Sequence, residues 1–172
     1  MSEFHDVLGA VGAFTSRAAE KLRRQGSAVS MLPVFVSKNR YGLAPPPHNY
    51  SATITLPIAT SDTSELLRYA RAVLKRLWQP DPVYKKAGVL FDGLEVAGQQ
   101  QLLLFEPNEQ AERRAKLMAD LDRLNERYVS GTVRFATVQA TVGRQPASYT
   151  GQRQWQSPAY TTNWDDLLQK RA

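Results

Sequence analysis

Apolar positions near the start of the chain recur at helical spacing. The recurring residues, three or four positions apart, are Val7, Val11, Phe14, Ala18 and Leu22. This spacing predicts an amphipathic helix over residues 3–25, ended by Gly26. A second stripe of this kind consists of Leu66, Leu67, Ala70, Val73, Leu74 and Leu77. It predicts a second helix, which Asp62 and Glu65 open at capping-box spacing and Pro80 follows.

Three other segments have the pattern of β-strands. Residues 28–39 are apolar and β-branched, and Pro33 among them indicates an edge strand or a bulge. Residues 49–60 alternate, with Ala52, Ile54, Leu56 and Ile58 on one side and Ser51, Thr53 and Thr55 on the other. Such alternation is typical of a sheet covered on one face only, and residues 84–94 predict a further strand. Residues 1–96 therefore predict an α+β fold, with two helices on one face of an antiparallel-type sheet.

The remainder of the chain divides into a linker and a helix-containing segment. Residues 97–107 contain Gly98 and glutamines, which indicates a linker. Within 108–172, a helix is expected over 109–128, with Leu117, Leu121 and Leu124 as its apolar seam. Residues 132–138 form a short strand-like run. The residues beyond it contain too few aliphatic side chains to form a core alone.

Composition narrows the classes of function. The chain has no cysteine, so disulfides and thiolate chemistry are excluded and a cytoplasmic location is expected. No apolar run is long enough for a membrane span, and His5 and His48 lie too far apart to suggest a zinc site. The net charge is +6, and residues 14–86 hold twelve Lys or Arg against four acidic residues. This concentration favours a polyanionic partner such as nucleic acid, the alternative being a merely soluble basic surface.

Catalysis by this chain is not expected. Polymerase chemistry needs carboxylates that share two Mg²⁺ ions, and the nearest candidates are Asp120 and Asp122. On a helix, residues two apart point about 200° away from each other, so these carboxylates cannot share a metal. The adjacent Asp165 and Asp166 have the position of helix-start charges. We therefore expect no enzyme activity and no cofactor in this chain.

Several motifs resemble a known family. They are Arg17–Arg23 (RAAEKLR), Tyr84–Val89 (YKKAGV), Gln101–Phe105 (QLLLF), Gly131–Ala136 (GTVRFA) and Ser157–Trp164 (SPAYTTNW). In this order they resemble the C-terminal region of the UmuC branch of Y-family translesion DNA polymerases, over essentially the whole chain. The last motif departs from the family at Ala159, where arginine is expected, so one contact of the tail is in doubt.

The resemblance implies a role for each part. Residues 1–96 correspond to the little finger, the accessory DNA-binding domain, here without the family's opening strand, so that an uncovered sheet edge could pair with a second copy. The Mg²⁺-binding palm would lie in the rest of a full-length DNA polymerase. The implied partners are primer–template DNA gripped without sequence preference, the bacterial sliding clamp, the UmuD′ dimer and RecA, in SOS mutagenesis and DNA repair. No membrane is implied.

The residues expected to contact DNA share one strand face or its surroundings. They are Ser51, Thr53, Thr55, Lys85, Lys86, Lys38 and Arg40. Hydroxyls and lysines donate to phosphate oxygens without reading bases. Two other basic groups, on the predicted helices, are expected to be solvated faces. They are Arg17, Lys21 and Arg24 on the first helix, and Arg68, Arg71, Lys75 and Arg76 on the second.

The peptide Gln101–Phe105 has the pattern of a clamp-binding motif. Gln101 would bond a small pocket while Leu102, Leu104 and Phe105 supply apolar anchors. The alternative is one more buried strand, which the polar, breaker-rich flanks disfavour. In the tail, Trp155, Tyr160 and Trp164 leave open a self-packed small domain or a tail ordered by a partner. The rival function is accordingly a protein-interaction fragment that binds a UmuD′-like regulator, its DNA affinity being incidental.

Overall fold

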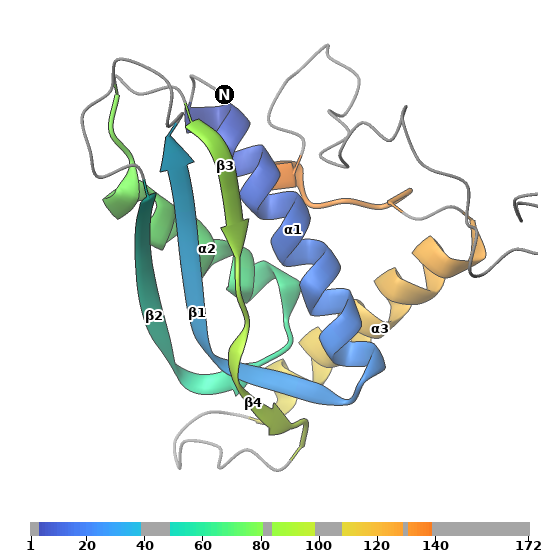
Figure 1. The fold of residues 1–172 in the computed structure, drawn as a ribbon. Coiled ribbons are helices and arrows are strands. Elements are labelled where there is room, and N and C mark those ends of the chain that lie inside the picture. The colour runs from blue at the N-terminus through green and yellow to red at the C-terminus, as the bar shows by residue number, and fades with distance from the viewer. Residues whose placement is uncertain (1–3, 39–48, 81–83, 99–107, 129–130, 139–172) are drawn as a thin grey trace, which may run out of the picture.

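The computed structural model describes residues 4–38, 49–80, 84–98, 108–128 and 131–138 (Figure 1). Its elements in chain order are α1 (Phe4–Arg24), β1 (Ser27–Lys38), β2 (Asn49–Thr60), α2 (Thr63–Leu77), β3 (Tyr84–Val89), β4 (Asp92–Val96), α3 (Asn108–Arg127) and the 3-10 turn η1 (Ala136–Val138). The predicted α+β class is confirmed. Among the helices described, none is both long and apolar enough to cross a membrane.

The sheet is antiparallel and is built around β1. On one side β1 pairs with β2, and on the other it pairs first with β4 and then with β3. Val29 lies opposite Leu94 of β4, and Val34 lies opposite Val89 of β3. The prediction of a single strand over 84–94 is therefore wrong, because the strand is interrupted at residues 90–91.

Pro33, for which the sequence predicts an edge strand or a bulge, lies in the centre of the sheet, opposite the break between β3 and β4. Its carbonyl oxygen accepts a hydrogen bond of 2.9 Å from the Leu90 backbone N–H. In a strand the nitrogen and the carbonyl of one residue point to the same side, so the missing N–H of Pro33 faces the break between β3 and β4. A proline is tolerated there because the ladder is interrupted on the β3/β4 side of β1 at that point, while Pro33 pairs with Thr53 of β2 on the other side.

The core lies between the sheet and the two helices α1 and α2. Figure 1 shows α2 crossing behind the strands. The buried residues at its centre are Val7 and Val11 of α1, Leu32, Val34 and Val36 of β1, and Leu66, Val73 and Leu74 of α2. In the apolar stripes predicted for the two helices, Phe14, Ala18 and Leu77 are only half-buried, and the other members are buried. Asp62 is confirmed as the cap, because its Oδ1 accepts from the backbone N–H of Ser64 at 2.7 Å and of Glu65 at 3.3 Å. The reciprocal bond of a capping box is not formed, because the Asp62 backbone N–H donates to Thr60 Oγ1 at 3.2 Å and not to Glu65.

The segment 131–138 returns to α1 and does not form a strand, so the strand-like prediction for it is wrong. A Cβ added at Gly12 of α1 would lie 3.5 Å from the carbonyl oxygen of Thr137, which shows how closely η1 approaches this helix. The backbone of the segment meets a helix surface and not a sheet edge. The segment therefore forms a hydrogen bond within itself, in which the Val138 backbone N–H donates to the Phe135 carbonyl oxygen at 2.9 Å.

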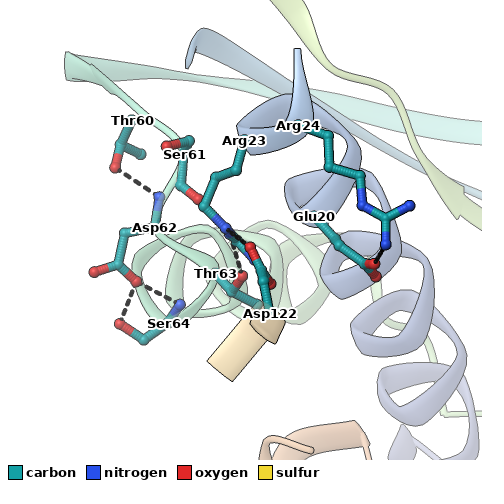
Figure 2. A network of polar contacts seen from close by, with 9 residues as sticks. All are labelled: Glu20, Arg23, Arg24, Thr60, Ser61, Asp62, Thr63, Ser64 and Asp122. Atoms are coloured by element: carbon teal, nitrogen blue, oxygen red, sulfur yellow. Dashed lines mark hydrogen bonds and ion pairs between the residues drawn. The ribbon is translucent and has the colours of Figure 1, made fainter. Parts of the chain in front are cut away.

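Arg23 joins α3 to the elements from α1 to β4, which we call the first domain (Figure 2). Its guanidinium donates to both carboxylate oxygens of Asp122 on α3, at 2.6 and 2.7 Å. It also donates to the Ser61 carbonyl at 2.7 Å and to Thr63 Oγ1 at 2.8 Å, at the start of α2. Three elements distant in sequence therefore meet at one half-buried side chain, and the two-bond geometry fixes the orientation of Asp122.

Replacing Arg23 by alanine is expected to lower the free energy of unfolding by about 1–3 kcal/mol, because it leaves Asp122 and Thr63 without their charged donor. A double-mutant cycle of Arg23→Ala and Asp122→Ala, measured by urea unfolding, should give a coupling of about 1 kcal/mol. The exposed pair Arg24–Glu20, 2.8 Å apart, is the control and should give less than about 0.5 kcal/mol. Equal couplings for the two pairs would contradict the anchoring role.

Candidate nucleic-acid interface

The sheet face opposite the helices carries a row of hydroxyls. Ser51, Thr53 and Thr55 of β2 are all exposed. Their neighbours across the ladder in β1 are Phe35, Pro33 and Met31 respectively. Directly opposed residues of an antiparallel pair lie on the same face, so the hydroxyl row runs beside an apolar row. We call this surface, formed by β2, β1 and β3, the open face.

Lys86 of β3 lies at one end of the open face, and Lys85 is next to it at the register shift between Ser37 and Lys38. Lys86 is opposite Ser37 of β1, and both Lys85 and Lys86 are exposed. At the other end of the sheet, the exposed Asp92 of β4 is opposite Met31. The face is therefore positive where β3 begins and negative where β4 begins. A phosphate should be attracted to the Lys86 end and repelled from the Asp92 end.

Phe35 and Gly88 form a close contact in the middle of the open face. A Cβ added at Gly88 would lie 2.5 Å from Cζ of the Phe35 ring, closer than real Cβ atoms approach. The ring therefore lies flat across β3 because Gly88 has no side chain. Sequence reasoning missed this contact, although a glycine inside a strand is a known signal of close approach.

Substituting Gly88 by alanine should displace the Phe35 ring and lower the free energy of unfolding by about 1–3 kcal/mol. The same substitution in a Phe35→Ala background should cost much less, because the obstructing ring is gone. Thermal or urea unfolding of the four proteins measures both effects. If Gly88→Ala lowered the free energy of unfolding equally in both backgrounds, the position of the Phe35 ring would not depend on Gly88.

Lys38, which is also predicted to contact DNA, does not join this surface. Lys38 is only 7% exposed and lies on the helix-covered side. Its Nζ donates to Tyr50 Oη at 2.9 Å and to Gln79 Oε1 at 2.8 Å, and lies 4.6 Å from the Tyr50 ring centroid. We therefore leave Lys38 out of the candidate interface. Arg40, the peptide 101–105 and Ala159 lie outside the described residues.

The remaining charged groups occupy other surfaces. The basic residues of the two helices are exposed on the helical layer, away from the open face: Arg17, Lys21 and Arg24 on α1, and Arg68, Arg71, Lys75 and Arg76 on α2. Asp122 contacts Arg23, whereas Asp120 pairs with Arg123 at 3.3 Å, so the two carboxylates do not converge. Within the described ranges, no group of three or more His, Cys, Asp or Glu residues could hold a metal ion.

Two family models match the chain. One, described as the impB/mucB/samB family C-terminal domain, covers residues 1–104 and hence every element from α1 to β4. The chain belongs to this family. The other, described as Domain of unknown function (DUF4113), covers residues 115–169. The predicted resemblance to the UmuC branch is thereby confirmed, and the open face lies within the region that the impB/mucB/samB model covers.

Curated relatives agree with the family models. Protein UmuC of Salmonella typhimurium strain LT2 is 32% identical over 168 residues, covering 98% of this chain and 39% of the relative. The MucB proteins of Salmonella typhimurium and Escherichia coli are each 34% identical over 174 residues, covering 94% of this chain and 37% of the relative. The chain thus spans less than half the length of these relatives. No solved structure matches it.

Proposed function

We propose that this chain is the DNA-gripping and clamp-docking part of a translesion DNA polymerase of the impB/mucB/samB family, acting in SOS mutagenesis and DNA repair. The observation that carries the proposal is the one-sided sheet. Helices cover one face, and the other exposes hydroxyls with Lys86 at one end, where the exposed Lys85 is the next residue of β3. The catalytic carboxylates and Mg²⁺ of the polymerase would lie elsewhere in the whole protein, and this chain would hold no active site.

On the open face, DNA would be held by its backbone. Hydroxyls of Ser51, Thr53 and Thr55 can donate to phosphate oxygens, and the two lysines can neutralise phosphates at the positive end. Neither group type reads base identity when it contacts phosphate. The open face therefore suits a domain that must follow a primer–template duplex of any sequence.

The DNA proposal predicts weak binding that depends strongly on salt. Kd should be of order 10⁻⁴–10⁻⁶ M near physiological salt, and equal for duplexes of unrelated sequence. Replacing Lys85 and Lys86 by alanine should flatten the dependence of log K on log salt by about one to two units. An unchanged slope in this double variant would move the contact to another surface, such as the helical layer. A strong sequence preference would contradict phosphate gripping altogether.

Docking to the sliding clamp is proposed for Gln101, Leu102, Leu104 and Phe105. The described strand β4 ends at Val96 and α3 begins at Asn108, and the peptide lies outside the described residues between them. Its residue types match what a clamp's apolar cleft and neighbouring polar pocket would accept. The UmuD′ dimer and RecA are proposed as further partners of the whole protein. If the open face fails its test, the rival function as a protein-interaction fragment is favoured.

A further inference from the structure

Helix α3 exposes an apolar stripe, and the Arg127 guanidinium contacts it within the described structure, 5.8 Å from the Tyr128 ring centroid. Its members Leu117, Leu124 and Tyr128 are 58%, 45% and 63% exposed, with the half-buried Leu121 between them. Leu117, Leu121, Leu124 and Tyr128 recur at steps of four, three and four, so they share one side of the helix. We call these four residues the α3 stripe. Soluble proteins seldom leave such a row of large apolar side chains in water without an occupant.

The α3 stripe points away from the contact that already holds the helix. Met118 is 2% exposed and Asp122 is bonded to Arg23, so these two residues mark the attached side of α3. At about 100° per residue, Met118 and Asp122 lie roughly 90–130° around the helix axis from the middle of the stripe. The first domain therefore does not occupy the stripe, and its occupant must come from elsewhere.

The family models point to the C-terminal tail as that occupant. The impB/mucB/samB model ends at residue 104, whereas the second model runs from 115 to 169 and so groups most of α3 with the tail. A sequence unit of that kind is expected to bury its apolar residues within itself. The tail supplies suitable partners, since Trp164, Leu167 and Leu168 have the spacing of one side of a helical turn.

Charge complementarity and the length of the connecting chain both favour contact between the tail and the α3 stripe. Arg114 and Arg127 are exposed beside the stripe, and the tail carries Asp165 and Asp166 among its apolar residues. Asp120, which also borders the stripe, is paired with Arg123. The helix of 20 residues is about 30 Å long, while the chain between Val138 and Trp155 can extend to about 55 Å, so the tail can return along the helix.

We propose that residues 155–168 fold back onto the α3 stripe, so that α3 and the tail form one small intramolecular unit anchored by Arg23. Of the two alternatives for the tail, the proposal is therefore the self-packed small domain and not a tail that a partner must order. Trp164, Leu167 and Leu168 would cover Leu117, Leu124 and Tyr128, with Asp165 and Asp166 near the flanking arginines. The proposal does not depend on DNA or clamp binding.

The test uses the full chain and two variants with matched charge. Leu117→Glu with Leu124→Glu places two carboxylates on the stripe, and Ala115→Glu with Ala119→Glu places two on exposed positions elsewhere on α3. Acrylamide quenching of tryptophan should rise about twofold or more in the stripe variant only, because Trp155 and Trp164 lose their cover while Trp78 is common to all. Equal quenching in all three proteins would overturn the proposal.

A second variant tests whether the stripe variant acts merely by unfolding α3. Leu167→Ser with Leu168→Ser leaves the helix sequence intact, and should speed amide hydrogen exchange over residues 117–128 about tenfold. No change there would contradict the proposal. Analytical ultracentrifugation must also give a monomer for the parent. If the parent is instead a dimer that the stripe variant dissociates, a second copy occupies the stripe and the intramolecular pairing is wrong.

Discussion

Replacing Leu104 and Phe105 together by alanine is expected to abolish measurable binding to the sliding clamp. Burial of these two side chains in an apolar cleft should contribute about 1.5–3 kcal/mol each, and Gln101 about 1 kcal/mol more through hydrogen bonds. After the entropic cost of ordering the peptide is subtracted, the expected binding free energy is about −8 kcal/mol, which corresponds to a Kd near the micromolar range. Removing both anchors leaves too little for a detectable complex. Isothermal calorimetry with purified clamp measures this directly.

A matched control distinguishes the loss of clamp docking from the general effect of removing exposed apolar side chains. Leu94→Ala with Val96→Ala removes two exposed apolar side chains of β4, close by in sequence, and should leave clamp affinity within about twofold. Parent-like binding by the Leu104/Phe105 variant would show that the peptide is not the tether. If that variant instead unfolds, as monitored by circular dichroism, the peptide is a buried strand and the alternative is correct.

Most of the first domain could be predicted from the sequence because its signals are local and periodic. The stripes containing Val11 and Leu74 recur at helical spacing, and each was enough to predict a helix and its buried side. The alternation through Thr53 and Ile54 likewise predicted which face of β2 is exposed. Each pattern arises because one side of an element is buried and the other is not.

The features that the local sequence pattern did not predict depend on which other part of the chain a strand or helix contacts. The break at residues 90–91 is visible only once β1 is seen to pair with both β3 and β4. Arg23 and Asp122 are 99 positions apart, and nothing in either neighbourhood singles them out from other charged residues. Lys38 was predicted to contact DNA by its charge, but strand alternation turns it toward Tyr50 and the covered side. Pairing and register decide such positions, and a single sequence does not display them.

Reversing the charge of Lys85 and Lys86 is expected to have the second large effect. The variant Lys85→Glu with Lys86→Glu should bind DNA at least about tenfold more weakly near 0.1 M salt, because two phosphate contacts become repulsive. The matched control is Arg71→Glu with Lys75→Glu, which makes the same change of net charge on the exposed helical layer. It should weaken binding by less than about threefold, because the proposed DNA contact lies on the other side of the domain.

The open face is proposed to grip DNA through the phosphates. Fluorescence anisotropy of a labelled primer–template duplex, titrated with the parent and both charge-reversal variants over a range of salt, tests this claim most directly. We expect log K to fall linearly with log salt for the parent, a nearly unchanged line for the α2 variant, and a weaker, flatter line for the β3 variant. Equal losses in the two variants, or parent binding that ignores salt, would contradict it.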